Sequence, residues 1–223
     1  MKQLTETQFL KDVADHKMTV IKDDGVHRHI RFSKPGTSCM HFDLITWPGY
    51  LCYTGDMGTY VFTRLLDMFE FFRTDRAAAW LKKKGLTLGI NPQYWGEKLE
   101  ATDKLDGFKK FSEEKFDAAI RRYFVEWIRS HRDDTSKEER RELWGAIECE
   151  VLGADGDGGG YRKQCAAHDF HHEVNRAVGN FYFQDFWETN VEEYSGRFMW
   201  CCYALAWGIQ QYDDAKEPAA LAA

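Results

Sequence analysis

Residues 40–72, MHFDLITWPGYLCYTGDMGTYVFTRLLDMFEFF, decide the fold class of this chain. Apolar side chains recur with a period close to two at 40–46 and again at 58–64, and the spacing lengthens toward that of a helix at 65–72. The tripeptide Trp47-Pro48-Gly49 suits a turn between two paired strands, because Pro fixes φ and Gly permits a positive φ. The stretch therefore predicts the central hairpin of an antiparallel sheet that runs into a helix.

A second hairpin is predicted upstream. The dipeptide Asp24-Gly25 is a turn signal between an apolar run at 18–21 and an alternating segment at 26–32. The alternation separates two faces of that strand, one with Val26, Arg28, Ile30 and Phe32 and the other with His27, His29 and Arg31. Two histidines on one face could be ligands, but we favour a solvated strand face. With a turn at 34–36, four or five antiparallel strands are expected in the first third of the chain.

Helical signals dominate after residue 64. Ser112 is the expected N-cap of a long helix, and Ser136 with Glu139 has the spacing of a capping box. Asn190 with Glu193 resembles a second box, ahead of a segment that is apolar nearly all round and should form the buried central helix. Further boundaries are predicted at Thr5 or Thr7 for the first helix, at Thr74 or Asp75 and Gly85 for a helix at 77–84, and at Pro218 for the end of the last helix.

Composition bounds the architecture and its environment. The chain has 223 residues, 43% hydrophobic and 15% aromatic, which suffices for one sizeable core or for two packed units. We expect an α+β protein with a helix-plus-sheet unit at 1–73, a helical unit at 74–215 and a flexible tail at 216–223. The six cysteines form no CxxC pair, so reduced and mostly buried thiols are expected. No segment has the character of a signal peptide or a membrane span, which predicts a cytoplasmic protein that makes no membrane contact.

The charge pattern argues against direct nucleic-acid binding. The formal net charge is −6, and acidic residues interleave with the basic side chains at 121–141, as on a solvated helical surface. The glycine-rich loop at 153–160 lacks the Lys-Ser or Lys-Thr that follows a phosphate loop, and Ala166 stands where a calcium loop needs a carboxylate. We therefore expect a flexible connector there and no cofactor.

The segment His168-Asp169-Phe170-His171-His172 is the main candidate for metal chemistry. On a helix, His168 and His172 would share one face at the spacing of zinc enzymes, with Glu188 or Glu192 as a third ligand. Asp169 stands where the zincin motif has Glu, and its shorter side chain would hold a general base too far from a metal-bound water. We expect a polar helix face with no metal and no catalytic residue, and keep a metal-dependent hydrolase as the alternative.

Two segments carry a resemblance, namely FDLITWPGYLCYTGDMGTYVFTRLLDMFEFFR at 42–73 and FMWCCYALAWGIQQYD at 198–213. They resemble a family of uncharacterised accessory proteins of bacteriophages and prophages, and the Trp-Pro-Gly and Gly-Asp-Met-Gly stretches are the most specific parts. The family supplies no activity for any residue, but the resemblance implies a setting in which accessory proteins bind and disable a host protein, including nucleases of antiviral defence.

The expected function is therefore binding and inhibition of a host protein without catalysis, in its sharpest form as an anti-CRISPR protein. The alternatives are the hydrolase built on His168 and His172 and a nucleic-acid-associated phage protein that uses the surface at 121–141. The final Leu221-Ala222-Ala223 resembles the end of the bacterial trans-translation tag, so the tail is predicted to be either a plain flexible end or a degradation signal.

Overall fold

The computed structural model describes residues 4–75, 78–105, 107–154 and 159–220. The chain divides into two compact units, one formed by 1–109 with 194–223 and the other by 110–193. It leaves the first unit along β7 (Lys109–Phe111) and returns along β10 (Glu192–Tyr194), and these two strands pair with each other. This division differs from the expected boundary after residue 73, because the last helix packs in the same unit as the N-terminal sheet.

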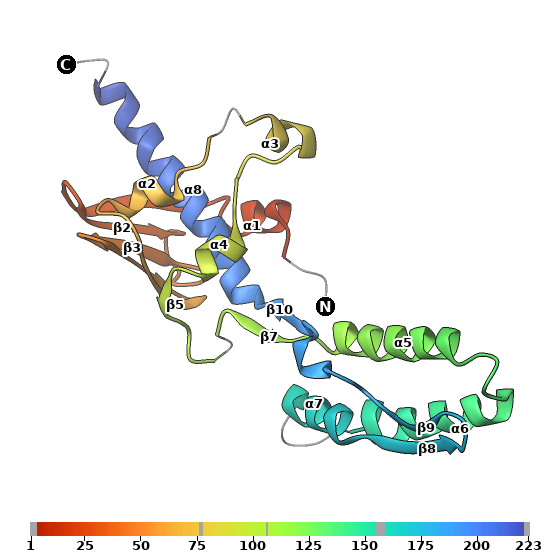
Figure 1. The fold of residues 1–223 in the computed structure, drawn as a ribbon. Coiled ribbons are helices and arrows are strands. Elements are labelled where there is room, and N and C mark those ends of the chain that lie inside the picture. Colours follow the sequence, from red (N-terminus) through yellow and green to blue (C-terminus); the bar gives the residue numbers. More distant parts are fainter. Residues whose placement is uncertain (1–3, 76–77, 106, 155–158, 221–223) are drawn as a thin grey trace. The chain divides into compact units, whose positions relative to one another are not determined.

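The first unit is built on a six-stranded antiparallel sheet in the order β1-β2-β3-β4-β5-β6 (Figure 1). The turns at Gly25 and Gly49 have φ of +59° and +84°, and they join strands at Asp24-Gly25 and at Trp47-Pro48-Gly49 as predicted. The strands are β1 (Lys17–Asp24), β2 (His27–Ser33), β3 (Phe42–Trp47), β4 (Tyr50–Gly55), β5 (Gly58–Thr63) and β6 (Leu99–Ala101). Sheet and helices together confirm the α+β class.

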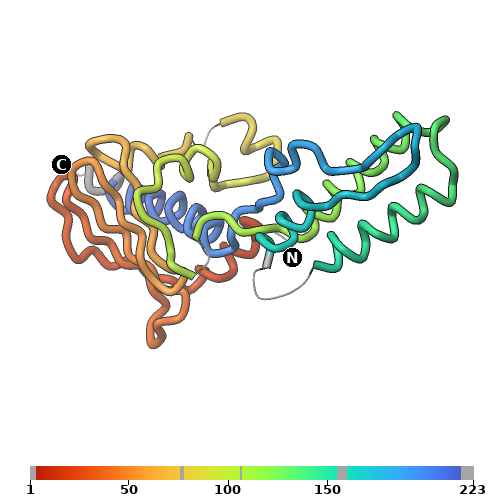
Figure 2. The backbone as a smooth tube through the Cα atoms, turned by 60° about the horizontal axis from the view of Figure 1, so that its bottom comes forward, coloured from red at the N-terminus to blue at the C-terminus, as the bar shows by residue number. Residues whose placement is uncertain are grey.

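One face of the sheet, here called the inner face, is covered by α8 (Gly196–Ala220), as Figures 1 and 2 both show. The backbone of α8 approaches the sheet closely at Gly208, where a Cβ atom would lie 3.0 Å from Leu44 Cδ1 and 3.1 Å from Phe32 Cε2. Phe198, Trp200 and other side chains all round this helix are buried, so the predicted central helix is confirmed. Shorter helices in this unit are α1 (Glu6–Asp12), α2 (Met68–Phe72), α3 (Ala79–Lys84) and α4 (Pro92–Gly96).

Both predicted ends of α8 are wrong. The helix begins after Ser195, whose Oγ accepts a hydrogen bond from the Phe198 N–H at 3.1 Å, whereas Asn190 Oδ1 accepts from Glu192 N–H at the start of β10. At the other end the helix passes Pro218 and runs to Ala220. Pro218 has no N–H, so the helix continues past it with one backbone hydrogen bond fewer. The predicted tail at 216–223 is thus helical as far as 220, and 221–223 lie outside the described residues.

Other boundaries show where capping signals succeed. Thr5 caps α1 by accepting from Gln8 N–H, and Gly85 ends α3 in a left-handed conformation with φ +65°. Neither Thr74 nor Asp75 caps α3, because that helix starts only at Ala79 after an Ala78 that makes no side-chain cap.

The second unit combines helices with a β-hairpin. Ser112 caps α5 (Glu113–Ser130), and the capping box of Ser136 and Glu139 opens α6 (Lys137–Ile147), both as predicted. The remaining elements are the π-helix η1 (Glu148–Leu152), α7 (Gly159–Asp169), β8 (His171–Asn175), β9 (Gly179–Tyr182) and the 3-10 helix η2 (Phe186–Glu188). The unit has its own buried cluster, which includes Phe116, Ile120, Leu143, Ile147 and Phe181.

Candidate binding surface

The face of the sheet opposite α8, here called the outer face, carries a mixture of apolar, aromatic and charged side chains. Strand alternation places these residues, because their inner-face neighbours are buried while they are partly or fully exposed, with the exception of Asp43, which is 5% exposed. Strand register arranges them in three rows: an aromatic row of Trp47, Tyr50 and Thr63; an apolar row of His29, Ile45, Cys52 and Val61; and a polar row of Arg31, Asp43, Thr54 and Thr59. The predicted outward direction of His27, His29 and Arg31 is confirmed.

The aromatic row is ordered by the turn that carries it. The rings of Trp47 and Tyr50 stack with centroids 5.4 Å apart and planes 13° from parallel, and both side chains are exposed. Thr63 Oγ1 donates a hydrogen bond of 2.9 Å to the carbonyl of Gly49, which ties the turn to β5. The stack is therefore held in place before any partner arrives, and this lowers the entropic cost of using it in an interface.

A carboxylate in contact with Arg31 and His29 organises the polar row. Arg31 donates from Nε and Nη2 to the two carboxylate oxygens of Asp43 at 2.8 Å each, and His29 Nε2 lies 2.9 Å from Asp43 Oδ2. Burial acts to raise the pKa of Asp43, but hydrogen bonds and charge from Arg31 and His29 outweigh it, so this pKa lies below its ordinary value. Asp43 is thus ionised at neutral pH, and its carboxylate already contacts the Arg31 guanidinium and the His29 ring.

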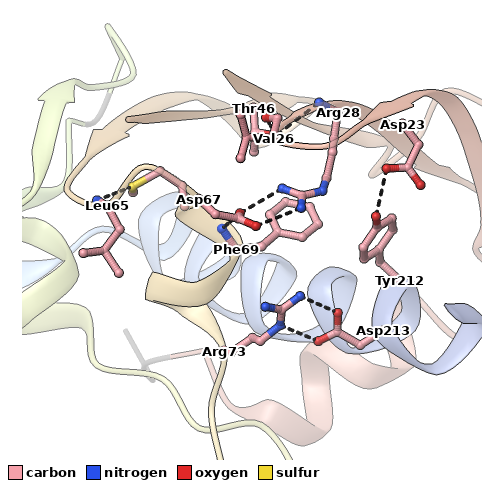
Figure 3. A network of polar contacts seen from close by, with 11 residues as sticks. Asp23, Val26, Arg28, Thr46, Leu65, Asp67, Phe69, Arg73, Tyr212 and Asp213 are labelled. Atoms are coloured by element: carbon pink, nitrogen blue, oxygen red, sulfur yellow. Dashed lines mark hydrogen bonds and ion pairs between the residues drawn. The ribbon is translucent and has the colours of Figure 1, made fainter. Parts of the chain in front are cut away.

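A separate polar network lies on the inner side of the sheet (Figure 3). Arg28 pairs with both carboxylate oxygens of Asp67 at 2.8 Å, and its guanidinium carbon lies 4.7 Å from the centroid of the Phe69 ring. Tyr212 donates to Asp23 at 2.9 Å, and Arg73 pairs with Asp213. These contacts join α2 and α8 to β1 and β2, so we assign them to holding the fold that presents the outer face.

The predicted helix face of His168 and His172 does not form. The helix α7 ends at Asp169, and His172 belongs to strand β8, where it pairs with Phe181 of β9. His168 is exposed with its Nδ1 2.9 Å from Asp169 Oδ1, while Glu188 and Glu192 lie in η2 and β10. Among the described residues no group of three His, Cys, Asp or Glu side chains could hold a metal ion. His168 and His172 are therefore not on one helix, and the spacing argument for the hydrolase does not apply to this structure.

Other sequence candidates are placed as follows. The six cysteines are free thiols, but only Cys201 and Cys202 in α8 are buried, so the expectation that most of them are buried is wrong. Most of the basic side chains at 121–141 are exposed, namely Arg121, Arg122, Arg129, Arg132, Lys137 and Arg141. Of the glycine-rich connector, 155–158 lie outside the described residues, and Gly159 begins α7.

A small cavity in the first unit adds little chemistry. Its volume is about 220 Å³, and its lining is Gln93, Gly96, Glu97, Phe108, Lys109 and Tyr194. Pockets for drug-sized ligands usually hold about 300–1,000 Å³, so this one fits only a smaller molecule.

Comparison with known proteins leaves this surface as the main source of functional inference. No family model matches the chain, and neither curated proteins nor solved structures gave a match. Within the part of the chain that the structure describes, no helix combines the length and hydropathy needed to cross a membrane.

Sequence reasoning missed the outer face as a surface. The sequence pattern assigns Trp47 to a turn, but the period-two alternation at 40–46 also puts Asp43 and Ile45 on the same side of the strand as Trp47. Alternation within each strand indicates which side chains point outward, but the rows also depend on the register between the four strands, which alternation within one strand does not determine.

Proposed function

We propose that the protein binds a protein partner through the outer face of its sheet and acts by occupying that partner, without catalysis. The observation that supports this most is the apolar row of Ile45, Cys52 and Val61, bordered by the stacked Trp47 and Tyr50 and by the paired Arg31 and Asp43. Interface centres are enriched in aromatic residues and Arg, and a polar rim surrounds them. The three rows have this composition on one ordered surface.

The same geometry favours a protein over a nucleic acid. Affinity for a phosphate backbone comes from Lys and Arg side chains that replace counterions. On the outer face Arg31 already pairs with Asp43, so its charge is largely compensated.

The partner we propose is a host protein in the bacterial cytoplasm. This part of the proposal comes from the resemblance to phage and prophage accessory proteins, and its sharpest form is inhibition of a defence nuclease complex, as an anti-CRISPR protein does. An exposed sheet face with ordered side chains is suited to covering a protein surface, which is how a non-catalytic inhibitor would act.

The experiment compares charge insertions on two surfaces of the same unit. Tagged wild type, Trp47→Arg, Val61→Arg and a control Trp80→Arg, which alters an exposed aromatic on α3, are used to capture partners from host lysate. The two outer-face variants should lose the partner that wild type and the control retain. With the purified partner, the dissociation constant should rise about 30-fold, the effect of losing a hot-spot residue worth about 2 kcal/mol.

Thermal melts verify that each variant is folded, and phage plating on a host with active CRISPR immunity reports on the anti-defence form. Equal binding by the outer-face variants and wild type would contradict the proposed surface. Salt-dependent binding of DNA or RNA by wild type, with no protein captured, would instead support the nucleic-acid alternative.

A further inference from the structure

Strand β1 is an open edge of the sheet. It is first in the strand order, β2 is its one neighbour among the strands that the structure describes, and its side chains are mostly exposed. Val20 and Ile21 at its centre are 48% and 51% exposed. An edge with free backbone groups and apolar side chains can accept another strand, and natural sheets usually protect such edges.

The residues of β1, KMTVIKDD, have a charge order that complements itself. Lys17 begins the strand, and Asp24 ends it. When two copies run antiparallel, the first residue of one lies opposite the last residue of the other. Lys17 of each copy then faces Asp24 of the other, which gives two opposite-charge pairs.

A bulge in β1 makes this alignment consistent with the faces of the sheet. The register with β2 shifts between Val20 and Lys22, so one extra residue enters the strand there. Lys17 pairs with Ser33 before the bulge and Asp24 with His27 after it, and both therefore lie on the outer face. In a strand without a bulge, residues seven apart would point to opposite faces and could not meet across two copies.

We infer that β1 pairs antiparallel with β1 of a second copy of this chain. The pairing places Lys17 opposite Asp24 at both ends and Val20 opposite Ile21 at the centre. Because the two-fold axis is perpendicular to the sheet, the outer faces of both copies lie on the same side of one continuous sheet. This inference uses the edge of the sheet and does not rest on the proposed function of its outer face.

The test is a charge swap followed by analytical ultracentrifugation of the full chain over low to high micromolar concentrations. Wild type should show a concentration-dependent dimer. Lys17→Asp and Asp24→Lys alone should each raise the dimer dissociation constant about tenfold or more, because symmetry applies the like-charge contact at both ends of the interface. The double variant K17D/D24K restores opposite charges at both ends and should return to near the wild-type constant.

Ile21→Lys provides a second check, because it brings two cations to the centre of the interface and should leave a monomer at every concentration. Circular dichroism of each variant verifies the fold. A wild type that stays monomeric throughout the range overturns the inference. So does a dimer whose dissociation constant is unaffected by the single charge reversals, since that dimer would use another surface.

Discussion

Replacing Asp67 by Asn should lower the free energy of unfolding by about 3 kcal/mol, because it leaves the Arg28 guanidinium without its counter-charge. The Arg28 side chain is 9% exposed and that of Asp67 is 18% exposed, so the pair is largely removed from water. Breaking a buried pair costs about 3–5 kcal/mol, and the residual exposure of Asp67 places this case at the low end. Asn can still accept from the Phe69 N–H as the carboxylate does at 2.9 Å, so the cap of α2 is retained.

The matched control lies in the same network (Figure 3). Arg73 and Asp213 make the same two-bond contact at 2.9 Å, but their side chains are 40% and 27% exposed. Asp213→Asn should therefore cost only about 0–1 kcal/mol. Urea unfolding at pH 7, read as a shift of the midpoint at constant slope, measures both variants. Equal losses for Asp67→Asn and Asp213→Asn would refute the argument that burial sets the value of the pair.

The pH dependence gives the same prediction an internal check. Burial acts to raise the pKa of Asp67, but its hydrogen bonds with Arg28 outweigh this, so the folded-state pKa is below the ordinary value. A depressed carboxylate pKa contributes stability above the unfolded-state pKa of about 3.9, and that contribution is lost as the pH falls through the folded-state pKa. The stability gap between wild type and Asp67→Asn should hold at neutral pH and shrink below about pH 4.

Three further predictions concern the core, a helix contact and the histidine cluster. Trp200→Ala should cost about 3–5 kcal/mol in urea unfolding, because this side chain is buried in α8, and near-wild-type stability would count against a central α8. Gly160→Ala should destabilise the protein by about 1–3 kcal/mol, since its Cβ would lie 1.9 Å from Phe111 Cγ. Gly145→Ala meets no atom within 4 Å and should stabilise α6 by about 1 kcal/mol. Thermal melts in which both variants shifted the melting temperature in the same direction would be inconsistent with the contact at Gly160. His168→Ala should leave partner binding intact, and stoichiometric zinc in the wild type that is lost together with activity in this variant would restore the hydrolase.

Local chemistry explains which elements could be predicted from the sequence. The turn at Gly49 and the caps at Ser112 and Ser136 depend on a few neighbouring residues, and all were placed correctly. The histidine segment fails for the opposite reason. Residues 168–172 fit a helical spacing, but the chain leaves the helix after Asp169 and pairs with β9, which is a contact that no local pattern encodes.

The long helix α8 shows the limit of such reasoning most clearly. A helical segment that is apolar all round predicts burial but does not indicate which residues surround it. In the structure, Phe32 and Leu44 of the sheet meet its backbone at Gly208, and Arg73, the residue that follows α2, pairs with Asp213 on it. The helix therefore completes the core of a sheet that was made at the other end of the chain. Residues 110–193 are consequently inserted between two parts of one unit, and a division of the sequence into consecutive segments could not have found this boundary.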